Sequence, residues 1–84
     1  MRHARVEALD ALEPLLGRLR AFAALKERSR GVFYVKSQAF LHFHEDPAGL
    51  FADVRPGVDW DRMPVNDAMD HVRLIVTVDR ALAE

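Results

Sequence analysis

Apolar residues in the first third of the chain recur every three or four positions. This spacing puts them on one face of a helix, which has to pack against other parts of the protein. Pro14 interrupts the stripe, because a proline inside a helix lacks a backbone donor and clashes with the preceding turn. The members of the stripe are Val6, Leu9, Leu12, Leu16, Leu19, Phe22 or Ala23, and Leu25.

Local signals predict where this helix begins and ends. Asp10 followed by Glu13 has the form of a capping box, so the main helix is expected to begin at Asp10, with a short lead helix or a kink near Pro14. Basic residues suit the negative end of the helix dipole, and a glycine is a common stop. The pattern therefore predicts a helix that ends near Gly31, after Lys26, Arg28 and Arg30.

After residue 31 the period changes from helical to strand-like. The segments VFYVK, AFLHFHE and LFADVR are rich in β-branched and aromatic residues. DPAG is a strong turn signal and KSQA a weaker one, while RPG at 55–57 ends the third segment. These features predict a three-stranded antiparallel meander.

The turns also predict a register. Pairing Glu45 with Leu50 across DPAG puts His42 opposite Asp53, and pairing Lys36 with Ala39 puts Phe33 beside His42. One face of the sheet is then an ordinary core face, comprising Val32, Tyr34, Leu41, Phe43, Leu50, Ala52 and Val54.

The other face of the predicted meander is mixed. Four large apolar side chains next to a polar cluster are not expected to remain in water, so a helix, a partner subunit or a ligand should cover them. We interpret this face as the ligand-binding surface. Its members are Phe33, Val35, Phe40, His42, His44, Phe51, Asp53 and Arg55.

The C-terminal segment allows two interpretations. Asn66 or Asp67 can cap a helix whose apolar stripe comprises Met69, Val72, Val76 and Ala83, flanked by Ile75 and Leu82. Alternation over 72–78 fits a fourth strand instead. We favour the helix, and we interpret PGVDWDRMP as a loop in which Trp60 forms a hydrophobic lid. The predicted fold is a single α+β domain over 1–84, with an N-terminal helix, three antiparallel strands and a C-terminal helix.

Composition adds expectations about assembly and location. The chain has 84 residues, no cysteine and 50% hydrophobic residues, and so much apolar surface in a small domain predicts a homodimer. A formal net charge of −1 creates no global attraction to nucleic acid or to an acidic membrane. Short apolar runs, the lack of an N-terminal signal core and the absence of cysteine predict a cytoplasmic protein.

Two histidines on one strand face are the main chemical signal. His42 and His44 can chelate a metal through imidazole nitrogens, with Asp53 as the third ligand. The same residues also fit a cross-strand pair of His42 and Asp53 with Arg55 nearby, which would be a polar patch or a subunit contact. If Asp53 orients His42, that imidazole becomes a candidate general base.

Basic residues near the end of the first helix offer another alternative. They could contact phosphates while the strand aromatics stack on bases, although the net charge disfavours nucleic-acid binding. The cluster comprises Arg18, Arg20, Lys26, Arg28 and Arg30, while His3 and His71 have no local partner and are expected at the surface.

The run GVFYVKSQAFLHFHEDPAGLFADVR, residues 31–55, resembles a group of short bacterial proteins of unknown function. The predicted order of elements, with Lys36 preceding an Ala-Phe strand, is also similar to the MmcQ/YjbR-like proteins of CyaY-like fold. That resemblance implies binding rather than catalysis. The sequence thus predicts a non-enzymatic interaction or ligand-binding module without a cofactor. The alternatives are a divalent-metal or acid/base site at His42, His44 and Asp53, and nucleic-acid binding.

Overall fold

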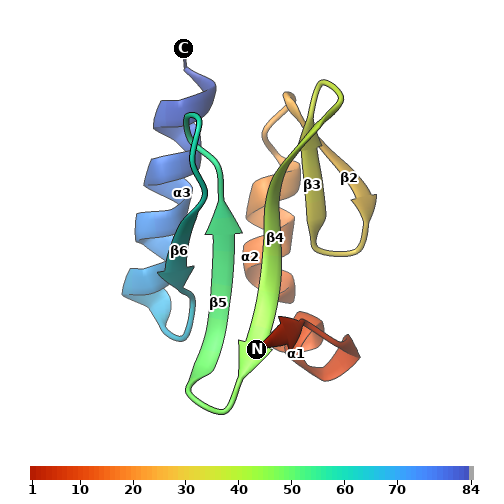
Figure 1. Ribbon diagram of the computed structural model, residues 1–84, viewed down its shortest axis with the longest axis vertical. Coiled ribbons are helices and arrows are strands. Elements are labelled where there is room, and N and C mark those ends of the chain that lie inside the picture. Colours follow the sequence, from red (N-terminus) through yellow and green to blue (C-terminus); the bar gives the residue numbers. More distant parts are fainter. Residues whose placement is uncertain (84) are drawn as a thin grey trace.

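The computed structural model describes residues 1–83, which form six strands and three helices (Figure 1). In chain order these are β1 (Arg2–His3), α1 (Val6–Ala11), α2 (Glu13–Arg20), β2 (Leu25–Ser29), β3 (Val32–Val35), β4 (Gln38–Asp46), β5 (Gly49–Val54), β6 (Asp61–Pro64) and α3 (Ala68–Leu82).

All strand pairs are antiparallel, and five strands form a meander in the order β2-β3-β4-β5-β6. The sixth strand, β1, pairs with the second half of β4, at His44 and Glu45. Along one edge, β4 pairs with β5. Along the opposite edge, it pairs with β3 in its first half and with β1 in its second half. The long strand β4 therefore holds β3 beside its first half and the N-terminal strand beside its second half.

The α+β class is right, but the predicted three-stranded meander with two helices is wrong. Residues 25–29 form β2 instead of the last turns of a helix, and residues 61–64 form β6 instead of a loop. Leu25 fits the helical stripe by spacing, but it is buried in β2 opposite Val35. Pairing with neighbouring strands outweighs local propensity in short polar segments of this kind.

The split of the N-terminal helix near Pro14 is confirmed. Helix α1 ends at Ala11, and α2 begins at Glu13 with Pro14 in its first turn, where the missing N–H is not needed. The main helix does not begin at Asp10, and Leu12 precedes α2 without a side-chain cap. Gly31 does not end a helix but lies in the turn between β2 and β3, with φ +77°.

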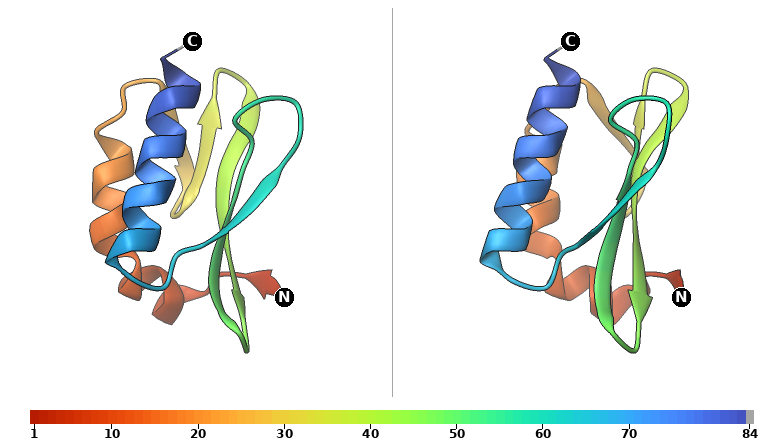
Figure 2. Two further views of the ribbon diagram at one scale, coloured as in Figure 1. Left: turned by 90° about the vertical axis from the view of Figure 1, so that its left-hand side faces the viewer. Right: turned by 60° about the vertical axis from the view of Figure 1, so that its left-hand side comes forward.

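Helices α2 and α3 cover one face of the sheet (Figure 2). In the described part of the chain no helix covers the other face, which we call the open face. The core lies between the two layers and contains leucines of α2 together with inward residues of the strands and α3. Its buried members are Leu12, Leu15, Leu16, Leu19, Leu25, Phe33, Phe40, Leu41, Phe43, Ala52, Val54, Val65, Leu74 and Val78.

The predicted pairing of β3 with β4 is wrong in two respects: the turn pairs Val35 with Gln38 instead of Lys36 with Ala39, and a bulge follows it. Phe33 pairs with Leu41, and Tyr34 pairs with Ala39, so Phe40 has no partner on β3. Strict alternation would have put Phe33 beside His42 on the open face. The bulge instead moves Phe33 into the core, where it is 1% exposed.

The C-terminal helix is confirmed, and residues 72–78 lie within it rather than in a fourth strand. Asp67 is the N-cap and accepts a hydrogen bond of 2.8 Å from the backbone N–H of Asp70. The predicted buried stripe is wrong, because Leu74 and Val78 face the core. Three members of that stripe are exposed instead, namely Met69, Val72 and Val76.

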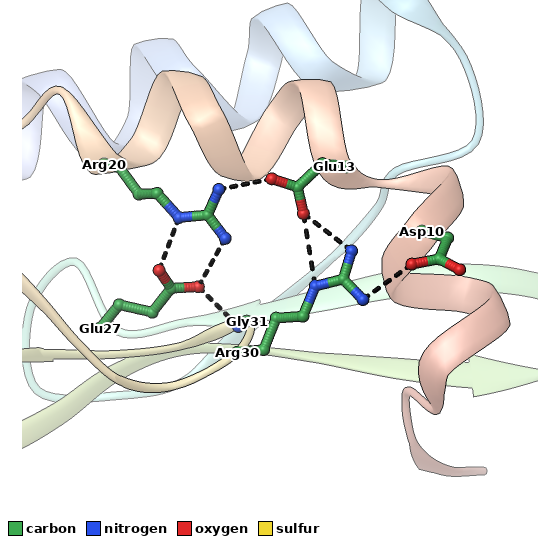
Figure 3. Close-up of polar contacts among 6 residues, drawn as sticks. All are labelled: Asp10, Glu13, Arg20, Glu27, Arg30 and Gly31. Carbon is green, nitrogen blue, oxygen red and sulfur yellow. Dashed lines mark hydrogen bonds and ion pairs between the residues drawn. The ribbon is translucent and has the colours of Figure 1, made fainter.

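An ionic network ties the N-terminal helices to the β2–β3 hairpin (Figure 3). Arg20 donates from Nε to Glu27 at 2.6 Å and also bonds to Glu13. Arg30, beyond the end of β2, bonds to both Glu13 and Asp10 at 2.8 Å. The carboxylate of Glu27 also accepts from the backbone N–H of Gly31 at 2.9 Å, so this single side chain links α2 to the hairpin turn.

Candidate metal site on the open sheet face

The register across the DPAG turn is confirmed and determines which side chains share the open face. Leu50 pairs with Glu45, Phe51 with His44, and Asp53 with His42. On the other edge of β4, His3 of β1 pairs with His44. Since side chains on directly paired residues point to the same face, these pairings bring three histidines from two strands together.

The three imidazoles of His3, His42 and His44 form the His cluster. One ring nitrogen of each lies within 4.8 Å of those of the other two. The ring centroids are separated by 4.8 Å for His3 and His44, 4.9 Å for His42 and His44, and 5.6 Å for His3 and His42. Three imidazoles converging in this way can serve as ligands to one metal ion.

Asp53 stands beside the His cluster but is bound to Arg62 of the edge strand β6. Arg62 donates from Nε and Nη2 to the two carboxylate oxygens at 2.7 and 2.8 Å. One of these oxygens also lies 3.1 Å from Nδ1 of His44, without the angular geometry of a hydrogen bond. Each oxygen of Asp53 thus accepts one hydrogen bond from Arg62, and His3 adds a third imidazole beside the predicted set of His42, His44 and Asp53.

The electrostatics of the site favour neutral imidazoles and a charged carboxylate. Burial lowers the pKa of His42, and the neighbouring His44 lowers it further. Burial also lowers the pKa of His44, which the nearby charge of Asp53 only partly opposes. The hydrogen bonds from Arg62 lower the pKa of Asp53. Neutral imidazole is the form that binds a metal.

Among residues 1–83, two buried side-chain nitrogens have no hydrogen-bond partner, and both belong to the His cluster. They are Nδ1 of His42 and Nδ1 of His44. Leaving a buried polar atom unpaired costs about 1–3 kcal/mol, so each such atom requires an explanation. A ligand or a metal ion bound to these rings would supply missing partners. A small rotation of the Asp53 carboxylate would let it accept a hydrogen bond from Nδ1 of His44.

The geometry also fits the dimensions of a zinc site. Zn–N bonds of about 2.0–2.1 Å in a tetrahedron separate two ligand nitrogens by about 3.3 Å. Nitrogens that lie within 4.8 Å of one another therefore need to approach by up to about 1.5 Å. Small rotations of the imidazole rings supply a movement of this size, particularly at His3, which is exposed.

Trp60 extends the site from the loop between β5 and β6. Its ring centroid lies 5.0 Å from that of His42, and the guanidinium of Arg55 lies 5.1 Å from the Trp60 ring. Trp60 keeps 41% of its surface exposed. Trp60 therefore lies against His42, while His3 is exposed.

Of the remaining predicted ligand-binding residues, two lie near the His cluster or Trp60 and two lie in the hydrophobic core. Phe51 is half-buried beside His44, as predicted, and Arg55 is half-buried beside Trp60. Phe33 belongs to the core and is removed from the open face by the bulge. Phe40 is also buried in the core cluster.

The sequence does not indicate that His3 and Arg62 join the site. His3 is at the surface as predicted, but it lies beside His42 and His44, and Arg62 lies in β6 instead of a loop. Trp60, predicted as a lid, lies against His42. The pattern around His3 is too short to predict a strand, since β1 has only two residues. For Arg62 one signal is usable, because a proline such as Pro64 is tolerated in an edge strand.

The predicted basic cluster is largely engaged within the protein. Arg20 and Arg30 bind carboxylates in the ionic network, and Arg28 lies over the ring of Tyr34 at 4.6 Å. Three of the five cations proposed to contact phosphate therefore already have partners.

Comparison with protein-family models, curated proteins and solved structures found no match. The resemblance to MmcQ/YjbR-like proteins therefore stays a prediction. Among the described helices, none combines the length and apolar character needed to cross a bilayer.

Proposed function

We propose that this protein is a metal-binding module that holds a divalent transition-metal ion, with zinc as the expected ion, on the open face of its sheet. The observation that carries the proposal is the convergence of one ring nitrogen from each of His3, His42 and His44 within 4.8 Å. The ligand-binding role of this face was expected from the sequence, and the His cluster supplies a specific ligand class.

The donor set supports this class of ion. Imidazole suits zinc, copper, nickel and iron, while calcium and magnesium prefer oxygen ligands. Three protein ligands leave a tetrahedral ion one open position for water or another ligand. Such a ligand would enter at His3, because His3 is exposed whereas Trp60 lies against His42.

Residues around the ligands support the site in the manner of known metal centres. A metal-binding histidine commonly directs its second nitrogen to a carboxylate, which fixes the ring orientation. Asp53 is 3.1 Å from Nδ1 of His44, so the Nε2 atom of that ring is left for the metal. Arg62 in turn fixes Asp53 with two hydrogen bonds.

The direct test is zinc titration of untagged protein by isothermal calorimetry. We expect one ion per chain, and we expect His3→Ala, His42→Ala and His44→Ala each to weaken binding by more than the roughly 10–100-fold typical of a change outside the ligand set. His71→Gln is the matched control. His71 is the fourth histidine, and its Nε2 lies 3.0 Å from the carbonyl oxygen of Val65, outside the cluster.

Trp60 provides an independent readout because it is the only tryptophan and its ring lies 5.0 Å from that of His42. Copper bound at the His cluster should quench its fluorescence, and because copper binds imidazole sites more tightly than zinc, only a large excess of zinc should reverse the quenching. If all four histidine variants bind zinc as the unchanged protein does, the proposal is wrong.

The same titration separates two ligand sets. With the His cluster as ligands, Asp53→Asn should weaken zinc binding by about 10–100-fold, as expected for an orienting residue. Should Asp53→Asn abolish binding while His3→Ala leaves it intact, the ligands would be His42, His44 and Asp53 instead.

A further inference from the structure

A second site lies at the opposite end of β4 from the β1 pairing, where the β3–β4 turn faces the segment after β5. A pocket of about 430 Å³ opens there, a volume within the range that accommodates small molecules. No carboxylate lines it. The residues used in the argument are Val35, Lys36, Ser37, Gln38, Phe40 and Arg55.

The rim of the pocket carries two positive charges. Neither Lys36 nor Arg55 forms an ion pair within residues 1–83. Arg55 is nevertheless held in place, because its Nη2 donates to the carbonyl oxygen of Ala39 at 2.7 Å and its guanidinium lies over the Trp60 ring. Its Nε and Nη1 atoms donate no hydrogen bond to residues 1–83, so this cation is both oriented and available.

Lys36 occupies a backbone position that would suit glycine better. Its φ is +58°, and it is the only residue other than glycine with positive φ in the described chain. A side chain with a Cβ atom is disfavoured in this left-handed region. A lysine at a strained turn position beside a pocket points to a use for its charge.

The inner part of the pocket is apolar. Phe40 is 7% exposed, and Val35 packs on the core from the adjacent strand. The hydroxyl of Ser37 and the amide of Gln38 add neutral hydrogen-bonding groups at the rim. The pocket thus combines an apolar wall with a cationic edge.

We infer that this pocket binds a small amphipathic oxyanion. Its carboxylate or phosphate group would contact Lys36 and Arg55, and its apolar body would lie against Phe40 and Val35. This inference is separate from the proposed metal function, since none of the lining residues belongs to the His cluster.

The test uses the full chain, freed of metal by chelation and desalting, so that no anion can bind through a metal ion. Benzoate and phenyl phosphate are titrated by calorimetry and by ¹H–¹⁵N NMR. The controls are benzamide, which lacks the charge, and inorganic phosphate, which lacks the apolar body. We expect at least one aromatic anion to bind about tenfold more tightly than either control, with amide shifts concentrated at Ser37, Gln38 and Gly57. The two anions distinguish a carboxylate from a phosphate ligand.

Two variants test the assigned charges. Lys36→Gly removes the amine while relieving the backbone strain, so this chain is expected to fold. Arg55→Gln removes the guanidinium. Each should weaken binding of the preferred anion by about tenfold, whereas Lys26→Gln, a change at the chain's other lysine, should leave it unchanged.

Several results would overturn the inference. The inference is wrong if benzamide binds as tightly as benzoate and phenyl phosphate, or if the NMR shifts are confined to regions outside the pocket. It is also wrong if Lys36→Gly binds the preferred anion as tightly as the unchanged protein does. Failure of zinc binding in a separate titration would refute only the metal proposal.

Discussion

Replacing Phe33 tests the bulge that separates the structure from the register expected by simple alternation. The structure places this ring in the core with 1% of its surface exposed. The expected register would have put it on the open face beside His42. The two arrangements predict very different costs for removing the same side chain.

The magnitude follows from burial. A buried phenylalanine removes about 150–250 Å² from water, and at about 25 cal/mol per Å² this amounts to about 4–6 kcal/mol as an upper estimate. Comparable Phe→Ala changes in protein cores cost about 3–5 kcal/mol. A domain of this size has a total stability of about 4–13 kcal/mol, so Phe33→Ala is expected to be severely destabilised. Phe33→Leu, which retains most of the volume, should cost about 1 kcal/mol and still fold.

The assay is urea unfolding followed by circular dichroism and by Trp60 fluorescence. Phe51→Ala is the matched control, because Phe51 is half-buried on the open face opposite His44. It should cost about 1 kcal/mol. Equal costs for Phe33→Ala and Phe51→Ala would refute the bulged pairing and return Phe33 to the open face.

Four further predictions address the metal, the turn, the ionic network and assembly. Zinc at 100 times its Kd should stabilise the protein by about 2.7 kcal/mol in thermal unfolding, and His3→Ala should remove this effect. Lys36→Gly should raise the free energy of unfolding by about 0.5–1 kcal/mol, because it relieves a positive φ. Hydrogen bonds from Arg20 lower the pKa of Glu27 below its ordinary value of 4.5, so this pair stabilises the protein above about pH 4.5 and the contribution is lost as the pH falls through the folded-state pKa. Glu27→Gln should therefore lower the urea midpoint at pH 7, and the difference from the unchanged protein should shrink as the pH falls below 4.5. The predicted homodimer is tested by light scattering, where the mass of one 9.6 kDa chain would refute it.

Strong local signals predicted two parts of the fold correctly. The DPAG turn and the alternation around it predicted the β4–β5 register residue by residue, from Glu45 with Leu50 to Leu41 with Val54. Asp67 was one of two predicted caps and begins α3. Both features depend on interactions between residues close in the sequence.

The errors fall where one local pattern supports two structures. Leu25 satisfies a helical stripe as well as a strand that buries it against the core. On α3, two apolar stripes are compatible with the sequence, one through Val72 and Val76 and one through Leu74 and Val78. Packing against the sheet buries the second stripe. Which structure forms, and which stripe of α3 is buried, depends on the residues of the sheet and helices that pack against each segment. The local sequence pattern does not contain that information.

The candidate site divides in the same way. The open-face positions of His42, His44 and Asp53 follow from the hairpin register. His3 joins them only because β1 pairs with β4, some 40 residues away in the chain. Likewise, Asp53 accepts two hydrogen bonds from Arg62 only because β6 pairs with β5.

By itself, the sequence determined the hairpin, the capped C-terminal helix and the side of the sheet on which two histidines emerge. Turn chemistry, capping and strand alternation act between near neighbours, so they can be recognised without knowledge of the rest of the chain. The tertiary structure decided which residues complete the site, how β3 is shifted against β4 and which face of α3 is buried. These outcomes depend on backbone pairing and packing between distant segments, whose free energies outweigh the weak preferences of short polar stretches.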